Sequence, residues 1–205
     1  IKVYFFVLTL GFSRRNYVRA FTNERLESWL AGMEGAFRHF GGVTEVVLLD
    51  NPKPLVTRHD VKAREMVFSE HFKAFAKHWG FTPRACAPYR ARTKGKDERG
   101  VGYVKRNAIA GREFASWADL EAHLERWMRE IADVRVHGTT EERPIDRFER
   151  ERAALRPIDG KPSFVQVREL RRVVHTDLCV ELDTNRYSVP WQHIGNEVTV
   201  RVRDG

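Results

Sequence analysis

The acid Glu98 lies at the end of a strongly basic stretch of the chain. Between Arg84 and Arg106 there are eight Lys or Arg against two Asp or Glu, a net charge of +6 in 23 residues. A helix beginning near Lys96 would place Glu98 and Lys105, seven positions apart, on one face. This arrangement suits a metal-bound carboxylate beside a nucleic-acid phosphate. A solvated helix start, where the helix dipole favours acids, explains the same residues and stays open at this point.

A second acid, Asp50, follows the apolar run Val46–Leu49. Such a run predicts a strand buried on both faces, and α/β sheets place their sites at the carboxyl ends of such strands. Asp50 and Glu98 are therefore the candidate catalytic residues and the candidate metal ligands, because hard cations such as Mg²⁺ prefer oxygen ligands. The neighbouring Asp97 would point about 100° away around a helix and is the weaker candidate.

Cations near these acids could neutralise nucleic-acid phosphates without reading sequence. The candidate DNA-binding residues are Lys94, Lys96, Arg99, Lys105, Arg106 and His137. For His137, a contact with DNA, the orientation of a loop and a capping or packed role all stay open.

The order of these features resembles a known superfamily. Asp50-Asn51-Pro52, then Pro88-Tyr89, Lys94-Gly95-Lys96 and Glu98-Arg99, is similar to the D-D-E transposases and retroviral integrases. More narrowly, the chain resembles the IstA-like transposases of insertion sequences that travel with an AAA+ helper ATPase. Residues 3–15 and the run Arg135-Val136-His137-Gly138-Thr139-Thr140 support this resemblance, which covers nearly the whole chain.

The resemblance implies an α/β fold, with an RNase H-like mixed sheet flanked by helices and a small β-barrel after it. It also implies two divalent ions, Mg²⁺ or Mn²⁺, held by three carboxylates. In such enzymes the ions cut a DNA 3′ end and drive its attack on target DNA. The implied partners are transposon ends, target DNA and further copies of the chain on DNA, with a helper ATPase as a further candidate partner.

One departure from the pattern concerns the first carboxylate, which the family carries on its first strand. The acids before Leu49 are all glutamates: Glu24, Glu27, Glu34 and Glu45. The sequence also begins without Met, in an apolar run. We therefore expect an internal fragment that lacks the family's first strand, holds only part of a β-barrel and is inactive by itself.

Composition and charge indicate the kind of partner and the location of the protein. The chain has 205 residues and a net charge of +8, which favours a polyanionic partner. No apolar run approaches the roughly 20 residues of a membrane span. Its two cysteines make no metal signature or disulfide framework, so we expect a cytoplasmic protein.

Hydrophobic spacing predicts three helices with apolar stripes. Their stripes run from Leu26 to Phe40, from Phe68 to Trp79 and from Trp117 to Ile131. The expected domains are a catalytic core over residues 1–140, a charged, proline-containing linker over 141–163 and a partial β-barrel over 164–205.

Two other functions stay open beside the transposase. The chain could be a remnant or regulator that binds DNA without catalysis, and the absent first Asp is what separates that hypothesis from a catalytic core. An RNase H-like nuclease, which would cleave without strand transfer, is the weaker third hypothesis.

Overall fold

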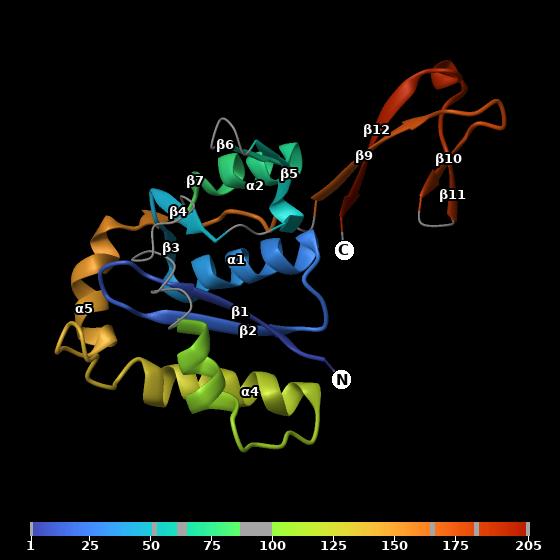
Figure 1. The fold of residues 1–205 in the computed structure, drawn as a ribbon. Coiled ribbons are helices and arrows are strands. Elements are labelled where there is room, and N and C mark those ends of the chain that lie inside the picture. Colours follow the sequence, from blue (N-terminus) through green and yellow to red (C-terminus); the bar gives the residue numbers. More distant parts are fainter. Residues whose placement is uncertain are drawn as a thin grey trace. The chain divides into compact units, whose positions relative to one another are not determined.

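The computed structural model of the chain describes residues 2–50, 53–60, 65–86, 100–164, 167–182 and 185–203. It divides into two compact units, residues 1–161 and residues 162–205 (Figure 1). Helices and strands alternate in the first unit, whereas the second consists mainly of strands. Each unit is described by itself.

The first unit is built around an antiparallel hairpin. Strand β1 (Tyr4–Thr9) pairs with β2 (Asn16–Phe21), from Tyr4 opposite Phe21 to Thr9 opposite Asn16. Because strand side chains alternate between faces, the hairpin carries apolar residues on both of its faces. One face packs against residues 100–110, helix α4 (Trp117–Trp127) and the π-helix η3 (Met128–Ala132). The other face contacts α1 (Leu26–Phe40) and α5 (Pro144–Glu151), so helices cover both sides (Figure 1).

Two glycines allow α1 to lie close to this hairpin. A Cβ atom on Gly32 would lie 2.6 Å from Cγ of the Phe6 ring, and one on Gly35 would lie 2.2 Å from the Tyr17 hydroxyl. Gly41, at the C-cap, adopts a φ of 69° and ends the helix. The predicted apolar stripe of α1 is confirmed, since Leu30, Met33, Phe37 and Phe40 are buried.

A cluster of aromatic rings joins α1 to α2 (Glu70–Trp79). The Phe37 ring of α1 lies 6.3 Å from Phe75 and 5.6 Å from Trp79, measured between ring centroids. Ser69 caps α2, because its Oγ accepts a hydrogen bond from the Phe72 backbone N–H at 3.2 Å. The predicted stripe is confirmed for Phe72, Phe75 and Trp79, which are buried, whereas Phe68 lies in the strand before the helix.

Helix α2 leads into a parallel strand pair. Strand β4 (Val46–Leu49) pairs with β7 (Thr82–Ala85), from Val46 opposite Thr82 to Leu49 opposite Ala85. The expectation that β4 is buried on both faces is wrong, since Leu48 is 48% exposed. Between these strands lie the turn η1 (Lys53–Leu55) and an antiparallel pair, β5 (Val56–Asp60) with β6 (Glu65–Phe68).

The segment expected to be a linker contains a packed helix. Helix α5 begins with Pro144 and inserts Phe148, 4% exposed, among Leu10, Ala36 and Phe40. After α5 come the turn η4 (Arg152–Ala154) and strand β8 (Arg156–Pro157), which pairs with β3 (Gly42–Val43). Residues 141–161 thus lie within the first unit rather than between two domains.

The second unit contains two antiparallel ladders. Strand β9 (Val167–Val173) pairs with β12 (Glu197–Arg203), and β10 (Cys179–Leu182) pairs with β11 (Asn185–Ser188). The turn η5 (Trp191–His193) precedes a single bridge between Val174 and Ile194. The pairing of β10 with β11 ends with Leu182 opposite Asn185.

The expected layers of helix and sheet are present in the first unit. The single mixed sheet is not, because the described strands of this unit form four separate two-stranded ladders and β1 shares none with β4. In the second unit the described strands likewise form two ladders, so the partial β-barrel stays an expectation.

Candidate functional site

Asp50 follows the last residue of β4 and its side chain is exposed. The parallel pairing of β4 with β7 continues one residue further, because the Cys86 backbone N–H donates to the Leu49 carbonyl at 2.9 Å. The carboxyl ends of the two strands therefore lie at the same edge. Asp50, at the end of β4, therefore lies beside the end of β7. In the sequence, β7 is followed by residues 87–99, which contain Glu98. This agrees with the strand-end position predicted for Asp50.

The other members of the predicted site fall partly outside the described residues. Those outside are Lys94, Lys96, Asp97, Glu98 and Arg99. The chain is described again from Gly100, where an added Cβ atom would lie 3.8 Å from Thr9 Oγ1 at the end of β1. The approach of Glu98 to Asp50 stays a prediction.

Residues 100–109, called here the Tyr103 helix, present Lys105 and Arg106 to solvent. The expected α-helix is wrong over part of this length. Val104–Ile109 form the π-helix η2, in which the Ala110 N–H donates to the Lys105 carbonyl at 2.9 Å. Seven-residue spacing therefore does not define one face through η2. Such wider turns occur often at functional sites.

Packing with α4 holds the Tyr103 helix in place. Val104 and Ala108 are fully buried, and Trp127 Nε1 donates to Asn107 Oδ1 at 2.8 Å. The rings of Tyr103 and Trp127 lie 5.4 Å apart. These contacts give Lys105 and Arg106 a fixed backbone while leaving their charges in water, as suits cations that contact phosphates.

His137 organises the loop that follows η3. Its backbone N–H donates to the Glu142 carbonyl at 3.0 Å, and its own carbonyl accepts from Glu141 N at 2.8 Å. Its Nδ1 accepts from the Thr139 N–H at 3.2 Å. Burial, and then the nearby guanidinium groups of three arginines, hold the pKa of His137 below its usual value. The loop-orienting role is thus visible, and a DNA contact through Nε2 stays a prediction.

Two arginines that sequence reasoning did not single out connect these parts. Arg135 lies with its Cζ 3.6 Å from the centroid of the Tyr103 ring, so it joins the Tyr103 helix to the His137 loop. Arg14, in the turn between β1 and β2, is one of the three arginines that lower the pKa of His137, with Arg135 and Arg147. The only sequence signal was their position inside the two runs that carry the family resemblance.

A buried ion pair supports the same region. Arg15 Nε donates to Asp133 Oδ2 at 2.9 Å, with 14% and 5% of the two side chains exposed. Burial raises the pKa of Asp133, and the attraction of Arg15 opposes that rise. The pair ties the β1–β2 turn to the end of η3 and is structural in character.

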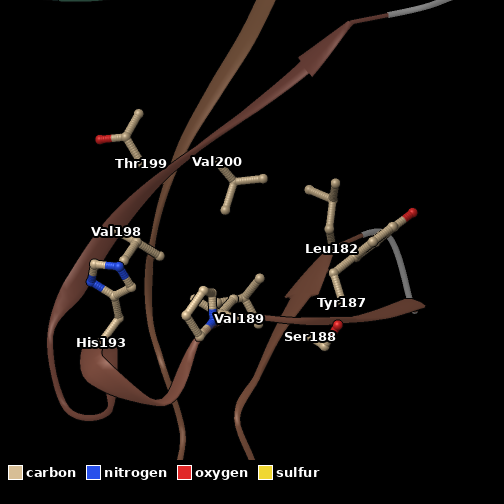
Figure 2. A pocket seen from close by; sticks show the side chains of 10 residues that line it. Leu182, Tyr187, Ser188, Val189, His193, Val198, Thr199 and Val200 are labelled. Carbon is tan, nitrogen blue, oxygen red and sulfur yellow. The ribbon is translucent and has the colours of Figure 1, made fainter.

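The second unit contains a hollow of about 570 Å³ (Figure 2). Its walls are mainly aliphatic, with Tyr187, Ser188, Thr199 and His193 at their polar positions, and none of its described lining residues is a carboxylate. We assign this hollow to the packing of the two ladders rather than to catalysis.

No helix among the described residues has the length and apolar character needed to cross a membrane. Within the described ranges, no three His, Cys, Asp or Glu side chains gather closely enough to hold a metal ion. Asp50 is an exposed carboxylate at the end of β4, and a metal site there would need further ligands.

The chain matches two family models. The integrase core domain matches residues 1–91, and the model described as Mu transposase, C-terminal domain matches residues 160–205. These two stretches correspond broadly to the start of the first unit and to the second unit.

Similar proteins are transposases from bacteria. The transposase for insertion sequence element IS21 of Pseudomonas aeruginosa is 40% identical, over 98% of this chain and 51% of its own length. The putative transposase for insertion sequence element IS5376 of Geobacillus stearothermophilus is 32% identical, over 99% of this chain and 50% of its own. The chain thus spans about half the length of the curated relatives it matches.

A solved structure shares the fold. It is a chain of the simian T-cell lymphotropic virus intasome in complex with PP2A regulatory subunit B56 gamma, with a TM-score of 0.54 and 15% identity. The match covers 95% of this chain and 72% of that one. Together with the integrase core match and the transposase relatives, it supports an RNase H-like α/β fold, and the chain belongs to the D-D-E transposases with an integrase core domain.

Proposed function

We propose that this chain forms the catalytic region of a DNA transposase, which cleaves transposon ends and transfers them into target DNA. The observation that carries the proposal is the position of Asp50 at the shared carboxyl edge of β4 and β7, within a chain that resembles transposases along nearly its whole length. The integrase core match over residues 1–91 includes this aspartate.

Asp50 and Glu98 are the proposed catalytic carboxylates and metal ligands. Asp50 fits this role as an exposed oxygen donor at a strand end, whereas Glu98 is assigned from the sequence pattern alone. Two Mg²⁺ or Mn²⁺ ions, when bound in a complete site, would stabilise the attacking and leaving oxygens of the phosphoryl transfer. The contribution of Asp50 itself is to offer carboxylate oxygens that solvent and phosphate can reach.

The charge distribution supports DNA as the partner. The second unit carries six Lys or Arg and six Asp or Glu, so the whole net charge of +8 belongs to the first unit. Lys105 and Arg106 are exposed within that unit. We propose that they contact phosphates together with Lys94, Lys96, Arg99 and His137. Further copies of the chain on DNA, an AAA+ helper ATPase and a cytoplasmic location are proposed from the resemblance.

A substitution at Asp50 tests the proposal. In the whole protein, Asp50→Asn should reduce strand transfer at least about 100-fold, because a neutral amide is a poor ligand for a hard divalent cation. Binding to the same DNA in EDTA should stay within about twofold of wild type. Strand transfer is measured with labelled transposon-end DNA and Mg²⁺.

Glu45→Gln is the matched control, since Glu45 is an exposed acid just before the same strand. It should leave both strand transfer and binding unchanged. If Asp50→Asn retains strand transfer, Asp50 is not a catalytic ligand. If cleavage persists without strand transfer in the wild type, the nuclease alternative is favoured. If binding and activity fall together, Asp50 is a structural residue.

A further inference from the structure

Three segments of the first unit converge around His137. The β1–β2 turn contacts α5, because Arg147 Nε donates to the Phe12 carbonyl at 3.0 Å and Glu151 Oε2 accepts from Ser13 N at 3.0 Å. The loop after η3, which carries His137, joins them, since its Glu142 carboxylate pairs with Arg147 and Arg150 of α5. Side chains from all three segments therefore share one small region.

Most arginines of this region are neutralised by carboxylates. Arg15 pairs with Asp133, and Arg143 pairs with Asp146. Arg147 and Arg150 both pair with Glu142. These arginines and carboxylates therefore form structural ion pairs. The pairs at the surface contribute little stability.

Two arginines remain after this pairing. Within the part of the chain that the structure describes, neither Arg14 nor Arg135 forms an ion pair with a carboxylate. The Nε of Arg135 is also buried with no hydrogen-bond partner among those residues. A buried donor without a partner is costly, so Arg135 has an unused hydrogen-bonding capacity. Glu141, the other acid of the loop, is exposed.

His137 can add a further donor to these cations. Its Nδ1 accepts from the Thr139 N–H, so the neutral ring carries its proton on Nε2. Both arginines act electrostatically on this ring and lower its pKa, which agrees with an excess of positive charge around it. Arg135 is held against the Tyr103 ring and is thereby oriented before any ligand arrives.

We propose that Arg14, Arg135 and His137 form a binding site for a phosphate group, occupied by a phosphodiester of the DNA backbone. Guanidinium groups match phosphate oxygens with paired hydrogen bonds, and such charge-assisted bonds are strong. Arg135 also packs on Tyr103. The site is therefore connected to the helix that carries the exposed Lys105 and Arg106. The choice of DNA as the source of the phosphate rests on the proposed function, but the binding itself requires no catalysis.

The first test observes His137 in the unaltered chain of 205 residues. The ring signals of His137 are followed by NMR over a pH series in EDTA, with a short DNA duplex, with inorganic phosphate, or with neither at the same ionic strength. A bound phosphate stabilises the protonated ring, so the duplex should raise the pKa of His137. No change with the duplex overturns the proposal. An equal change with inorganic phosphate at the same phosphate concentration overturns the assignment to DNA.

The second test removes one cation without straining the backbone. Arg14 has a φ of 65°, a conformation that Asn adopts more readily than most residues, so Arg14→Asn should fold normally. The slope of log affinity for duplex DNA against log salt concentration should fall by about 0.9, the value expected when one phosphate is no longer neutralised. Arg126→Gln on α4 is the control, because Arg126 is exposed and lies outside the His137 region.

An unchanged slope for Arg14→Asn, with a normal unfolding transition, would contradict the site, and so would an equal fall for Arg126→Gln. Both measurements are made in EDTA and without strand transfer. Failure of this site would therefore leave the Asp50 result intact, and failure at Asp50 would leave this site intact.

Discussion

His39 shows how a single residue of α1 can couple stability to pH. Its ring lies 5.4 Å from the Tyr17 ring and 5.2 Å from the Phe40 ring, and its Nε2 is buried without a hydrogen-bond partner among the described residues. Burial, and secondly the charge of Arg15, lower the pKa of His39 from 6.5 to about 4. The folded chain therefore holds this ring neutral where an unfolded chain would protonate it.

The sign of the resulting pH dependence follows from linkage. Between pH 6.5 and about 4 the unfolded chain binds a proton at His39 that the folded chain does not, so the free energy of unfolding falls as the pH falls. This contribution is fully present above pH 6.5. Allowing for partial exposure of the ring, wild type should lose roughly 1–3 kcal/mol more than His39→Leu across this window. Denaturant unfolding at the two ends of the window measures the difference, and equal losses in both proteins would show that the ring is not held neutral.

Close packing determines how individual elements meet, and Gly32 is the sharpest case. A methyl group there would overlap three atoms of the Phe6 ring at 2.6–2.8 Å, and the ring is part of the β1–β2 hairpin. Overpacking of this kind costs about 1–3 kcal/mol, whereas replacing Gly by Ala inside a helix contributes about 1 kcal/mol in the opposite direction. Gly32→Ala should therefore lower the free energy of unfolding by up to about 2 kcal/mol.

The double variant Phe6→Leu with Gly32→Ala is the matched control for this prediction. Leucine leaves room for the added methyl group, so the two substitutions should couple favourably by at least about 0.5 kcal/mol in a double-mutant cycle. Denaturant unfolding of the four proteins gives the coupling energy. Simple additivity would mean that Gly32 does not contact Phe6 in solution.

The sequence predicts those elements whose apolar pattern is local, and it does not predict those that depend on contacts with distant residues. Helices α1, α2 and α4 carry apolar stripes at helical spacing, which is information contained within each segment. Helix α5 has few apolar residues in a charged stretch, and its burial depends on Phe148 meeting Leu10 and Phe40, far away in the chain. The pairing of β3 with β8 is equally non-local.

The candidate site divides in the same way. Asp50 could be predicted because an acid after an apolar run marks a strand end. The π-helix η2 could not, since its wider turns accompany the burial of Val104 and Ala108 and the contact of Asn107 with Trp127. Nor could sequence show that Arg14 and Arg135 lack partners among the described carboxylates, because only the fold determines which arginines form ion pairs.

At the scale of the whole molecule, charge separates the two units. The second unit has equal numbers of basic and acidic residues and therefore no net charge. Its exposed Arg171 pairs with Glu197, and its exposed Arg186 pairs with Asp177. Non-specific DNA binding depends on cations that release counterions from phosphates. We therefore expect the salt dependence of DNA binding to arise mainly in the first unit.

Paired substitutions in the two units test this expectation. Lys105→Ala with Arg106→Ala removes two exposed cations from the Tyr103 helix, and the slope of log affinity against log salt should fall by up to about 1.8, or about 0.9 for each phosphate that is no longer neutralised. Arg171→Ala with Arg186→Ala removes the same charge from the second unit and should change the slope by less than about half a unit. The decrease in affinity should be similar for unrelated duplex sequences, because phosphate contacts carry no base information. Fluorescence anisotropy over a salt series measures both slopes. A larger effect from the second pair would place the main DNA-binding surface in the second unit.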